Sequence, residues 1–369
     1  MPLLAILKDK ISYVNMSNNV FSIHNLDLVF GDNKFHLENI DKVSIKAGEI
    51  LGILGESGCG KSTFGKCLIG LINYRDKERF NVTQLGIKKR TASIKFPMDA
   101  HVFCNDNVLE GTKKELQEYR RKVQMIFQNP RSALNLNMPV HKILKEAIKL
   151  DNPNIKKIDL NQKIEAIAKK FEIGGDNWDR IKTTKPKDLS GGERRRLGIA
   201  KVFATNPDVI IADEPVASLD VSVRGKILET LFEEWEYRQK EWKTGKRAQP
   251  LTIIIITHDF NLIQKMCHRT IVFYGDIHVK RGTVVEVFQN NIIPEKMHPY
   301  TEKLRRDAQY MSNIRTDIFS NEKLETRKKL VRTGCVYVNR CSLAHDHCFE
   351  KQPPLEYMGN YHKAACFEL

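Results

Sequence analysis

The sequence has no apolar run long enough to cross a membrane. Stretches such as 253–256 are far shorter than the roughly 20 residues that a transmembrane helix needs. The first residues, 1–7, lack a basic start and hold too short an apolar core for a secretion signal. We therefore expect a cytoplasmic protein that reaches a membrane only through a partner.

Acidic residues are also scarce, since 45 aspartates and glutamates face 60 lysines and arginines, which gives a net charge of +15. A basic balance indicates nucleic acid, an anionic membrane surface or acidic partners. The basic residues are nevertheless spread along the chain, without a long basic tail. We interpret them as a solvated surface that could lie near anionic lipid. Their small clusters are 88–90, 194–196 and 327–329.

Cysteine is sparse over most of the chain, where four of the eight residues are scattered. The other four lie within the last 35 residues, and they are Cys335, Cys341, Cys348 and Cys366. A reducing cytosol argues against disulfides. The spacing lacks the C-x₂-C pair of a typical zinc site. Four thiols in one short segment indicate a [4Fe–4S] cluster, a zinc ion or a small cap of reduced thiols.

One segment fits a known chemical pattern without a mismatch. Residues 55–62 read GESGCGKS and match the phosphate-binding pattern G-x-x-x-x-G-K-[ST]. An apolar run, 50–54, precedes them and a helix-compatible stretch, 62–72, follows, as a phosphate loop requires. Lys61 would reach the outer phosphates and the Ser62 hydroxyl would hold Mg²⁺. The predicted ATP contacts here are Gly55, Glu56, Ser57, Gly58, Cys59, Gly60, Lys61, Ser62 and Thr63.

Strand-like and helix-like segments alternate along the chain, which predicts an α/β fold with a parallel sheet at its core. The expected strands are 20–30, 43–45, 100–104, 123–128, 208–212 and 251–256. The expected helices are 113–122, 139–150, 161–171, 193–204 and 221–237, with a charged helical stretch after residue 299. Two polar segments, 75–97 and 239–250, are interpreted as inserted surface loops.

Two further motifs fit nucleotide chemistry. The apolar run 209–212 ends in Asp213 and Glu214, where Asp213 would hold Mg²⁺ through water and Glu214 would polarise the attacking water. The alternative for these acids is a solvated turn after a strand. Residues 189–193 read LSGGE and start a helix with a hydroxyl and bare backbone amides, which is a second anion site.

At this point the sequence resembles the ATP-binding cassette family, whose signature is LSGGQ. Glu193 departs from that signature at a tolerant position. Gln128 stands where the family has its Q-loop glutamine, 218–220 resembles the D-loop, and His258 resembles the switch histidine. The resemblance implies a RecA-like core, an antiparallel β subdomain and an α-helical subdomain.

The resemblance also implies roles for single residues in a head-to-tail pair of ATPase domains. ATP would lie between the phosphate loop of one chain and the signature of the other. The implied catalytic residues are Glu214, His258, Lys61 and Gln128, and the implied Mg²⁺ ligands are Ser62, Gln128 and Asp213. The implied ATP contacts outside the phosphate loop are Ser190, Gly191, Gly192, Glu193 and Asp220. An aromatic residue should stack on adenine, and Phe30 or Phe35 fits this role.

The match is more specific than the generic motifs. Five segments resemble the ATPases of oligopeptide, dipeptide and nickel importers, namely 120–130, 132–135, 220–223, the HPYT at 298–301 and the element at 334–341. The Q-loop region looks more like the second, F-like, ATPase subunit of these importers. This implies an extension at 1–19, an ATPase domain at 20–298 with its helical subdomain near 129–190, and a Cys-rich domain at 299–369. In such ATPases the four-cysteine tail is associated with a [4Fe–4S] cluster.

The resemblance further implies the partners of the chain. We expect a second ATPase subunit, more often a paralogue than a copy, two integral membrane permease subunits that contact about 129–150, and indirectly a solute-binding protein. The ATPase would then lie at the cytoplasmic face of the cell membrane. The alternative is a soluble cassette ATPase acting on nucleic acid or ribosomes. Such proteins usually carry two cassettes or a long coiled coil, and this chain has one phosphate loop and no sustained heptads.

Overall fold

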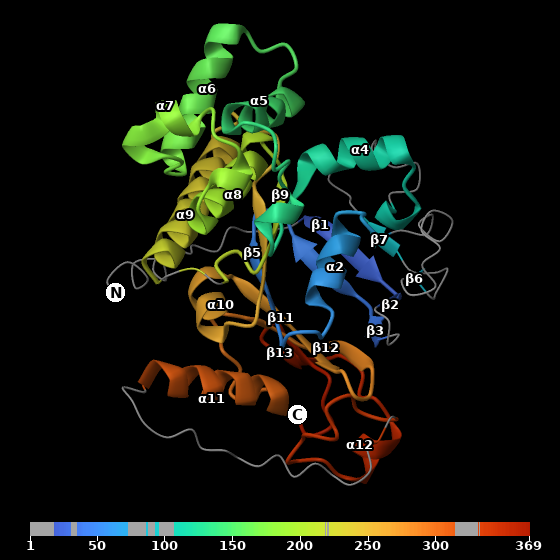
Figure 1. Cartoon of the computed structure of the whole chain (residues 1–369). Helices are drawn as coiled ribbons and strands as arrows, with labels where there is room; N and C mark the ends of the chain where they lie inside the picture. Colours follow the sequence, from blue (N-terminus) through green and yellow to red (C-terminus); the bar gives the residue numbers. More distant parts are fainter. Residues whose placement is uncertain are drawn as a thin grey trace. The chain divides into compact units, whose positions relative to one another are not determined.

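The computed structural model describes residues 18–30, 35–72, 86–87, 93–95, 107–217, 219, 221–313, 331 and 333–369. The chain divides into two compact units, Met1–Gly111 with Ile256–Leu369, and Thr112–Ile255 (Figure 1). Several predictions, namely the extension before residue 18, the strand 100–104 and the basic clusters 88–90 and 327–329, lie outside the described residues.

The first unit contains a mixed sheet with the strand order β6-β2-β3-β12-β11-β5. Its strands are β2 (Leu26–Phe30), β3 (Phe35–Ile40), β5 (Ile50–Leu54), β6 (Gly86–Ile87), β11 (Arg269–Asp276) and β12 (Arg281–Gln289). Every residue of β5 is buried, and β5 lies parallel to β11, which pairs antiparallel with β12. The phosphate loop therefore leaves the sheet from a fully buried strand.

A smaller sheet in the same unit corrects two predictions. It has the order β4 (Val43–Lys46), β1 (Asn19–His24) and β7 (Ser93–Lys95). The single strand predicted at 20–30 is two strands, because Asn25 has a left-handed φ of 50° and its amide donates to Asp41. The segment 75–97 is not only a loop, since β6 pairs with β2 and β7 pairs with β1.

The helices of the first unit are α2 (Lys61–Leu68), η2 (Val108–Glu110), α10 (Phe260–Met266), α11 (Pro299–Asn313) and α12 (Asp346–Glu350). After α12 the chain forms the hairpin β13 (Glu356–Gly359) and β14 (His362–Ala364). β14 pairs with β12, and the ring of His362 bonds to the fully buried Glu286 at 2.7 Å. The cysteine-bearing segment is thus bound to the same sheet that carries the phosphate loop.

The second unit is mostly helical and holds strands in the order β8-β9-β10. Its helices are α4 (Lys113–Lys122), η3 (Pro130–Ser132), α5 (Val140–Asp151), α6 (Lys157–Lys170), η4 (Gly175–Asn177), α7 (Trp178–Ile181), η5 (Pro186–Asp188), α8 (Gly191–Ala204) and α9 (Val221–Lys243). Its strands are β8 (Val123–Ile126), β9 (Val209–Asp213) and β10 (Thr252–Thr257), of which β10 crosses the division between the units. β8 and β9 pair in parallel, as the α/β prediction requires.

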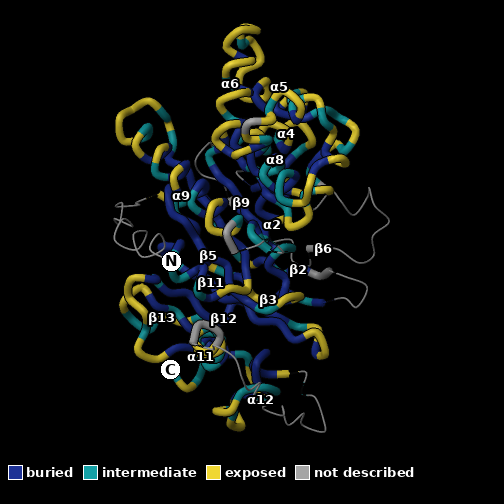
Figure 2. Tube along the Cα trace, turned by 60° about the vertical axis from the view of Figure 1, so that its left-hand side comes forward, coloured by how far each residue is buried: buried dark blue, intermediate teal, exposed yellow. Residues whose placement is uncertain are grey.

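Helix boundaries in this unit follow from local chemistry. α4 starts with a capping box in which Thr112 and Glu115 satisfy each other's backbone amides. α9 continues to Lys243, so the segment predicted as a loop from 239 begins as helix. Buried strands and exposed helix faces alternate along the chain (Figure 2). Within the described residues, no helix combines the length and apolarity needed to span a bilayer.

Candidate functional site

The phosphate loop depends on glycine at its first position. Gly55 follows β5 directly, and a Cβ atom there would lie 2.2 Å from the Phe273 carbonyl oxygen. Gly60, with a φ of 102°, turns the chain into α2 at Lys61. Both glycines of the sequence pattern are therefore required by the backbone path. The loop between them includes the buried Cys59, whose thiol pKa is raised by burial and which packs as a core residue.

Lys61 closes the loop on itself. Its ammonium donates to the carbonyl oxygens of Gly55 at 2.7 Å and Glu56 at 2.8 Å, and the side chain is buried. Ser62 and Thr63 are half-buried on the first turn of α2. Among the described residues no side chain caps this helix, so its N-terminal amides can serve an anion. This arrangement places a positive charge and the N-terminus of a helix around one loop.

Glu56 connects this loop to the C-terminal part of the chain. Its carboxylate pairs with the Arg340 guanidinium through contacts of 2.8 and 3.0 Å, and its amide donates to the Tyr300 hydroxyl at 2.8 Å. Burial raises the pKa of Glu56, but the hydrogen bonds and charge of Arg340 outweigh it, so the pKa is lowered overall. Glu56 is therefore a carboxylate at neutral pH and faces Arg340.

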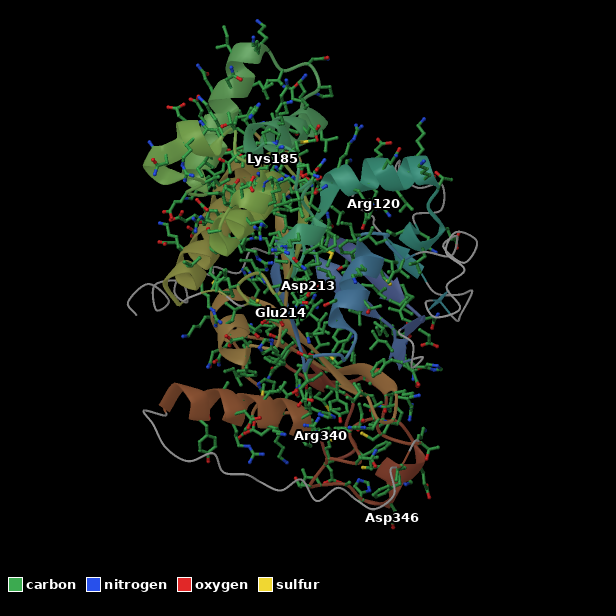
Figure 3. All side chains as sticks on the ribbon, in the orientation of Figure 1. Arg120, Lys185, Asp213, Glu214, Arg340 and Asp346 are labelled. Carbon is green, nitrogen blue, oxygen red and sulfur yellow. The ribbon has the colours of Figure 1, made fainter. Side chains whose placement is uncertain are left out.

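In the second unit, the two acids stand where β9 ends. Asp213 is the last residue of the strand and is buried, and Glu214 follows it in the loop (Figure 3). Glu214 is half-buried and has a left-handed φ of 46°, an uncommon conformation for a residue with a side chain. The strand thus ends in an abrupt turn that carries the two acidic residues.

The sequence does not single out Arg195, because this residue lies in a basic cluster that is typical of a solvated surface. The structure buries both Arg194 and Arg195. Arg195 donates to the carbonyl of Phe127 at 2.7 Å, to that of Pro215 at 2.9 Å and also to those of Gln128 and Glu214. One side chain on α8 therefore ties the loop after β8 to the loop after β9.

Arg194 stabilises the entry to the signature instead. Its guanidinium donates to the carbonyls of Pro186 at 2.8 Å and Leu189 at 2.9 Å. These contacts satisfy carbonyls of the turn that precedes α8. The expectation of a solvated basic surface is therefore wrong for these two arginines, since their charges serve internal backbone groups.

The signature segment begins α8 with a capping box. The Ser190 hydroxyl accepts from the Glu193 amide at 3.2 Å, and the Glu193 carboxylate accepts from the Ser190 amide at 2.9 Å. These bonds lower the pKa of Glu193. A Cβ atom at Gly191 would meet nothing within 4 Å, and at Gly192 only the tip of Arg196 at 3.6 Å. The packing of the described part of the chain therefore does not require either glycine.

Some of the remaining predicted site residues lie near strand ends, and others lie outside the described residues. Gln128 is exposed shortly after β8, and His258 is exposed directly after β10. Ser218 and Asp220 of the expected D-loop are not among the described residues, and neither is the side chain of Phe30. Phe35 is buried, with its ring close to Gly275 and Gly282, so it packs in the core rather than presenting a stacking face.

The four late cysteines come together in the C-terminal segment. The Cys335 amide donates to the Cys348 carbonyl at 2.8 Å. Burial, with the other three thiols as a smaller cause, raises the pKa of Cys335 to about 11. Burial also raises the pKa of Cys366, which Cys341 and Cys348 raise further. Among the described residues, however, no three histidine, cysteine or acidic side chains are arranged to hold a single metal ion.

Comparisons with known proteins agree with this geometry. The ABC transporter family matches residues 37–217. The oligopeptide transport ATP-binding protein OppF of Escherichia coli (strain K12) is 30% identical, over 90% of this chain and 88% of that protein. OppF of Haemophilus influenzae is 29% identical over 98% of both chains.

Solved structures agree on the fold. CbiO1 from Clostridium perfringens, described as part of the ABC transporter complex cbiONQ, is 23% identical, covers 80% of this chain and 100% of its own, and has a TM-score of 0.53. This likeness confirms the predicted phosphate-loop α/β fold of an ABC ATPase. The chain belongs to the ABC transporter family and is an ATPase of the ABC type.

Proposed function

We propose that this chain is the ATP-hydrolysing subunit that energises an importer of peptides. The observation that carries the proposal is a complete phosphate loop, closed by Lys61, in a chain that aligns over 90% of its length with an oligopeptide transport ATP-binding protein. The relatives are named for peptide transport, and peptides are therefore the solute class we propose. Nickel is the alternative solute, and a role on nucleic acid has no support in the relatives.

We further propose roles for the residues of each unit. Lys61 neutralises the outer phosphates, and Ser62 contributes a ligand to Mg²⁺. On the second unit, Asp213 and Gln128 would be ligands to Mg²⁺, and Glu214 would polarise the attacking water. His258 contacts the γ-phosphate. Stacking on adenine is assigned to Phe30, because Phe35 is buried in the core.

A second ATPase subunit completes the proposed site. Among the described residues, nothing lies within 4 Å of a Cβ atom at Gly191 and only the tip of Arg196 lies near one at Gly192, and these two residues start a helix. An anion from outside the chain can approach such a surface closely. We propose that ATP held by a partner subunit occupies it, and that the partner is a paralogue. Asp220 belongs to this contact.

We propose that the chain lies on the cytoplasmic face of a membrane, bound to two permease subunits. Residues 129–150, which include η3 and α5, form the edge that receives them. A solute-binding protein delivers the peptide on the other side. The proposed domain division is an ATPase domain at 20–298, whose helical subdomain covers about 129–190, and a Cys-rich domain at 299–369.

Four thiols within the last 35 residues match the number of thiolate ligands that a [4Fe–4S] cluster takes, and a zinc ion is the alternative. We propose that Cys335, Cys341, Cys348 and Cys366 would hold a [4Fe–4S] cluster, which would cross-link this segment. Because the pKa of Cys335 is about 11, loading must displace protons.

Co-purification tests the proposal. An affinity-tagged chain extracted in mild detergent should bring down two integral membrane subunits and a second ATPase. The complex should hydrolyse ATP faster when a peptide-loaded binding protein is added. Recovery with ribosomes or nucleic acid, or stimulation by nickel and not by peptide, would contradict it. The Lys61→Ala variant is the matched control, since it should assemble without hydrolysis.

A further inference from the structure

The phosphate loop and the Cys-rich segment are bonded through one residue. Arg340 comes directly before Cys341, and its guanidinium holds both carboxylate oxygens of Glu56, 284 residues away in sequence. Both residues belong to the same compact unit. A bidentate arginine–carboxylate pair fixes the orientation of both side chains as well as their distance. The second residue of the phosphate loop is thereby held from the C-terminal segment.

The same residue of the loop has a second anchor. The Glu56 amide donates to the hydroxyl of Tyr300, near the start of α11, at 2.8 Å. Tyr300 is fully buried, and its ring lies 5.5 Å from that of Tyr337 and 4.7 Å from that of Tyr274. Glu56 is therefore held through its backbone by Tyr300 and through its side chain by Arg340, and both of these residues lie next to the Tyr274 ring.

Arg340 is itself placed by the fold of the cysteine segment. Its amide donates to the Tyr337 carbonyl at 3.0 Å, and the Val338 amide donates to that of Cys335 at 3.1 Å. The guanidinium carbon also lies 5.9 Å from the centre of the Tyr274 ring. Consecutive turns thus connect Cys335 to Arg340, which binds Glu56. Figure 3 shows Arg340 within this C-terminal region.

Holding Glu56 also holds Lys61. The Lys61 ammonium bonds to the carbonyl of Glu56, the residue whose amide and carboxylate are anchored by Tyr300 and Arg340. A shift of Glu56 would therefore move one of the two carbonyls that position Lys61. A loop that is already held in its binding conformation has a higher affinity for its ligand, because the cost of ordering the loop is smaller. A change in the C-terminal segment can therefore move Lys61, whose ammonium is proposed to neutralise the phosphates.

We propose that Arg340 is a positioning residue for ATP, through which the Cys-rich segment keeps the phosphate loop in its binding shape. The inference rests on the proposed function, since it requires that this loop binds ATP. The C-terminal segment thereby contributes to the affinity for ATP. The chemistry of hydrolysis stays with the other residues, so substitutions here should alter KM for ATP and spare kcat.

The test is a titration of the purified full chain with a fluorescent ATP analogue, together with steady-state hydrolysis. Arg340→Met should weaken ATP binding about tenfold, as expected for loss of a charge-assisted bidentate contact, and should leave kcat at saturating ATP within about twofold. Arg340→Lys should fall between this variant and the wild type. Glu56→Gln should weaken binding similarly, and the double variant should bind no worse than Arg340→Met, because one interaction is removed.

Arg281→Met is the matched control. Arg281 forms a two-pronged pair with Glu38 in the same unit, and its side chain is exposed to a similar extent, 20% against 23% for Arg340. It also donates to the Gly334 carbonyl, so its loss loosens the same segment without touching the phosphate loop. Unaltered ATP affinity in Arg281→Met supports the proposal.

Two results would overturn the inference. One is a wild-type affinity for the ATP analogue in Arg340→Met. The other is an equal loss of this affinity in Arg281→Met, which would show that the whole unit is loosened. A wild-type chain that fails to bind the analogue would instead refute the proposed function. The two failures are therefore distinguishable. Thermal melting of each variant confirms that the protein titrated is folded.

Discussion

At the scale of residues, the site combines a strained backbone with a buried arginine. Glu214 has a left-handed backbone, which costs about 1–3 kcal/mol for a residue other than glycine and persists only where neighbours hold it. Arg195 supplies that hold, because it binds the carbonyl of Glu214 and of the next residue, Pro215. The backbone at Glu214 is therefore held from α8.

Substitution of Glu214 tests its role directly. Glu214→Gln keeps the shape of the side chain but removes the charge that is proposed to polarise water, so hydrolysis should fall by about 10²-fold or more while ATP still binds. Single-turnover hydrolysis and nucleotide titration measure the two effects. Glu193→Gln is the control, because it changes the same residue type in the signature. Near-normal turnover in Glu214→Gln would remove this residue from the role.

Loss of Arg195 should affect stability and turnover together. Arg195→Met leaves the four carbonyls that it serves without their donor, so the free energy of unfolding should fall by about 2–4 kcal/mol. The rate constant kcat should also fall about tenfold, since the loops that carry Gln128 and Glu214 lose their link. Denaturant melting and steady-state kinetics provide the measurements.

Arg196→Met is the comparison for Arg195. Arg196 is half-buried and donates to one carbonyl, that of Glu172, at 3.2 Å. Its loss should cost less than about 1 kcal/mol of stability. Equal effects of the two substitutions would show that Arg195 has no special role in joining the loops.

Acid should destabilise the fold partly through His298. Burial lowers the pKa of His298 to about 3, and its ring accepts a bond from the Tyr300 amide. In the unfolded chain this histidine binds its proton near pH 6.5. The stabilisation by the neutral ring is therefore complete above pH 6.5. As the pH falls toward 3, the free energy of unfolding should decrease by about 1 kcal/mol per pH unit. Melting curves between pH 7.5 and 5 measure this slope.

His298→Asn keeps an acceptor for the Tyr300 amide but does not titrate. Its melting temperature should therefore depend less steeply on pH than that of the wild type. Part of the slope should remain, because burial also lowers the pKa of His268. An unchanged slope in His298→Asn would show that this ring does not control acid stability.

At the scale of elements, the start of α8 serves two purposes that can be separated. Ser190 caps α8, and Thr112 caps α4 with the same geometry. Alanine at either position should cost about 1 kcal/mol of stability. Only Ser190→Ala should also slow hydrolysis, by about tenfold, because only this hydroxyl faces the proposed ATP of the partner. Matched denaturant melts and ATPase assays test this, and equal turnover in the two variants would contradict it.

Elements were predictable from the sequence where the signal was local. The phosphate loop, α4, α5 and β9 follow from short patterns, since a glycine spacing, a cap or a buried run acts within a few residues. The break at Asn25 and the short strands β6 and β7 could not be predicted, because pairing with distant strands creates them. The same reason hid Arg195, two of whose partners lie 67 and 68 residues away, and Arg340, whose partner lies 284 residues away.

At the scale of the whole molecule, metal analysis shows whether the late cysteines hold a metal centre or form a cap of reduced thiols. Protein purified without oxygen should hold about four irons and sulfides per chain, with broad visible absorption. Cys341→Ser should lose the iron, while Cys67→Ser, a change in the buried part of α2, should keep it. Zinc in place of iron, or an absence of both metals, would contradict the cluster.

The central claim is that ATP hydrolysis by this chain drives the movement of peptides. The most direct measurement is uptake of a labelled peptide into proteoliposomes that contain the complete complex, with ATP on the side of this chain. We predict ATP-dependent uptake by the wild type and a loss of uptake in Glu214→Gln, although that variant still binds ATP. Uptake that proceeds equally in Glu214→Gln, or hydrolysis that is never coupled to peptide, would contradict the account.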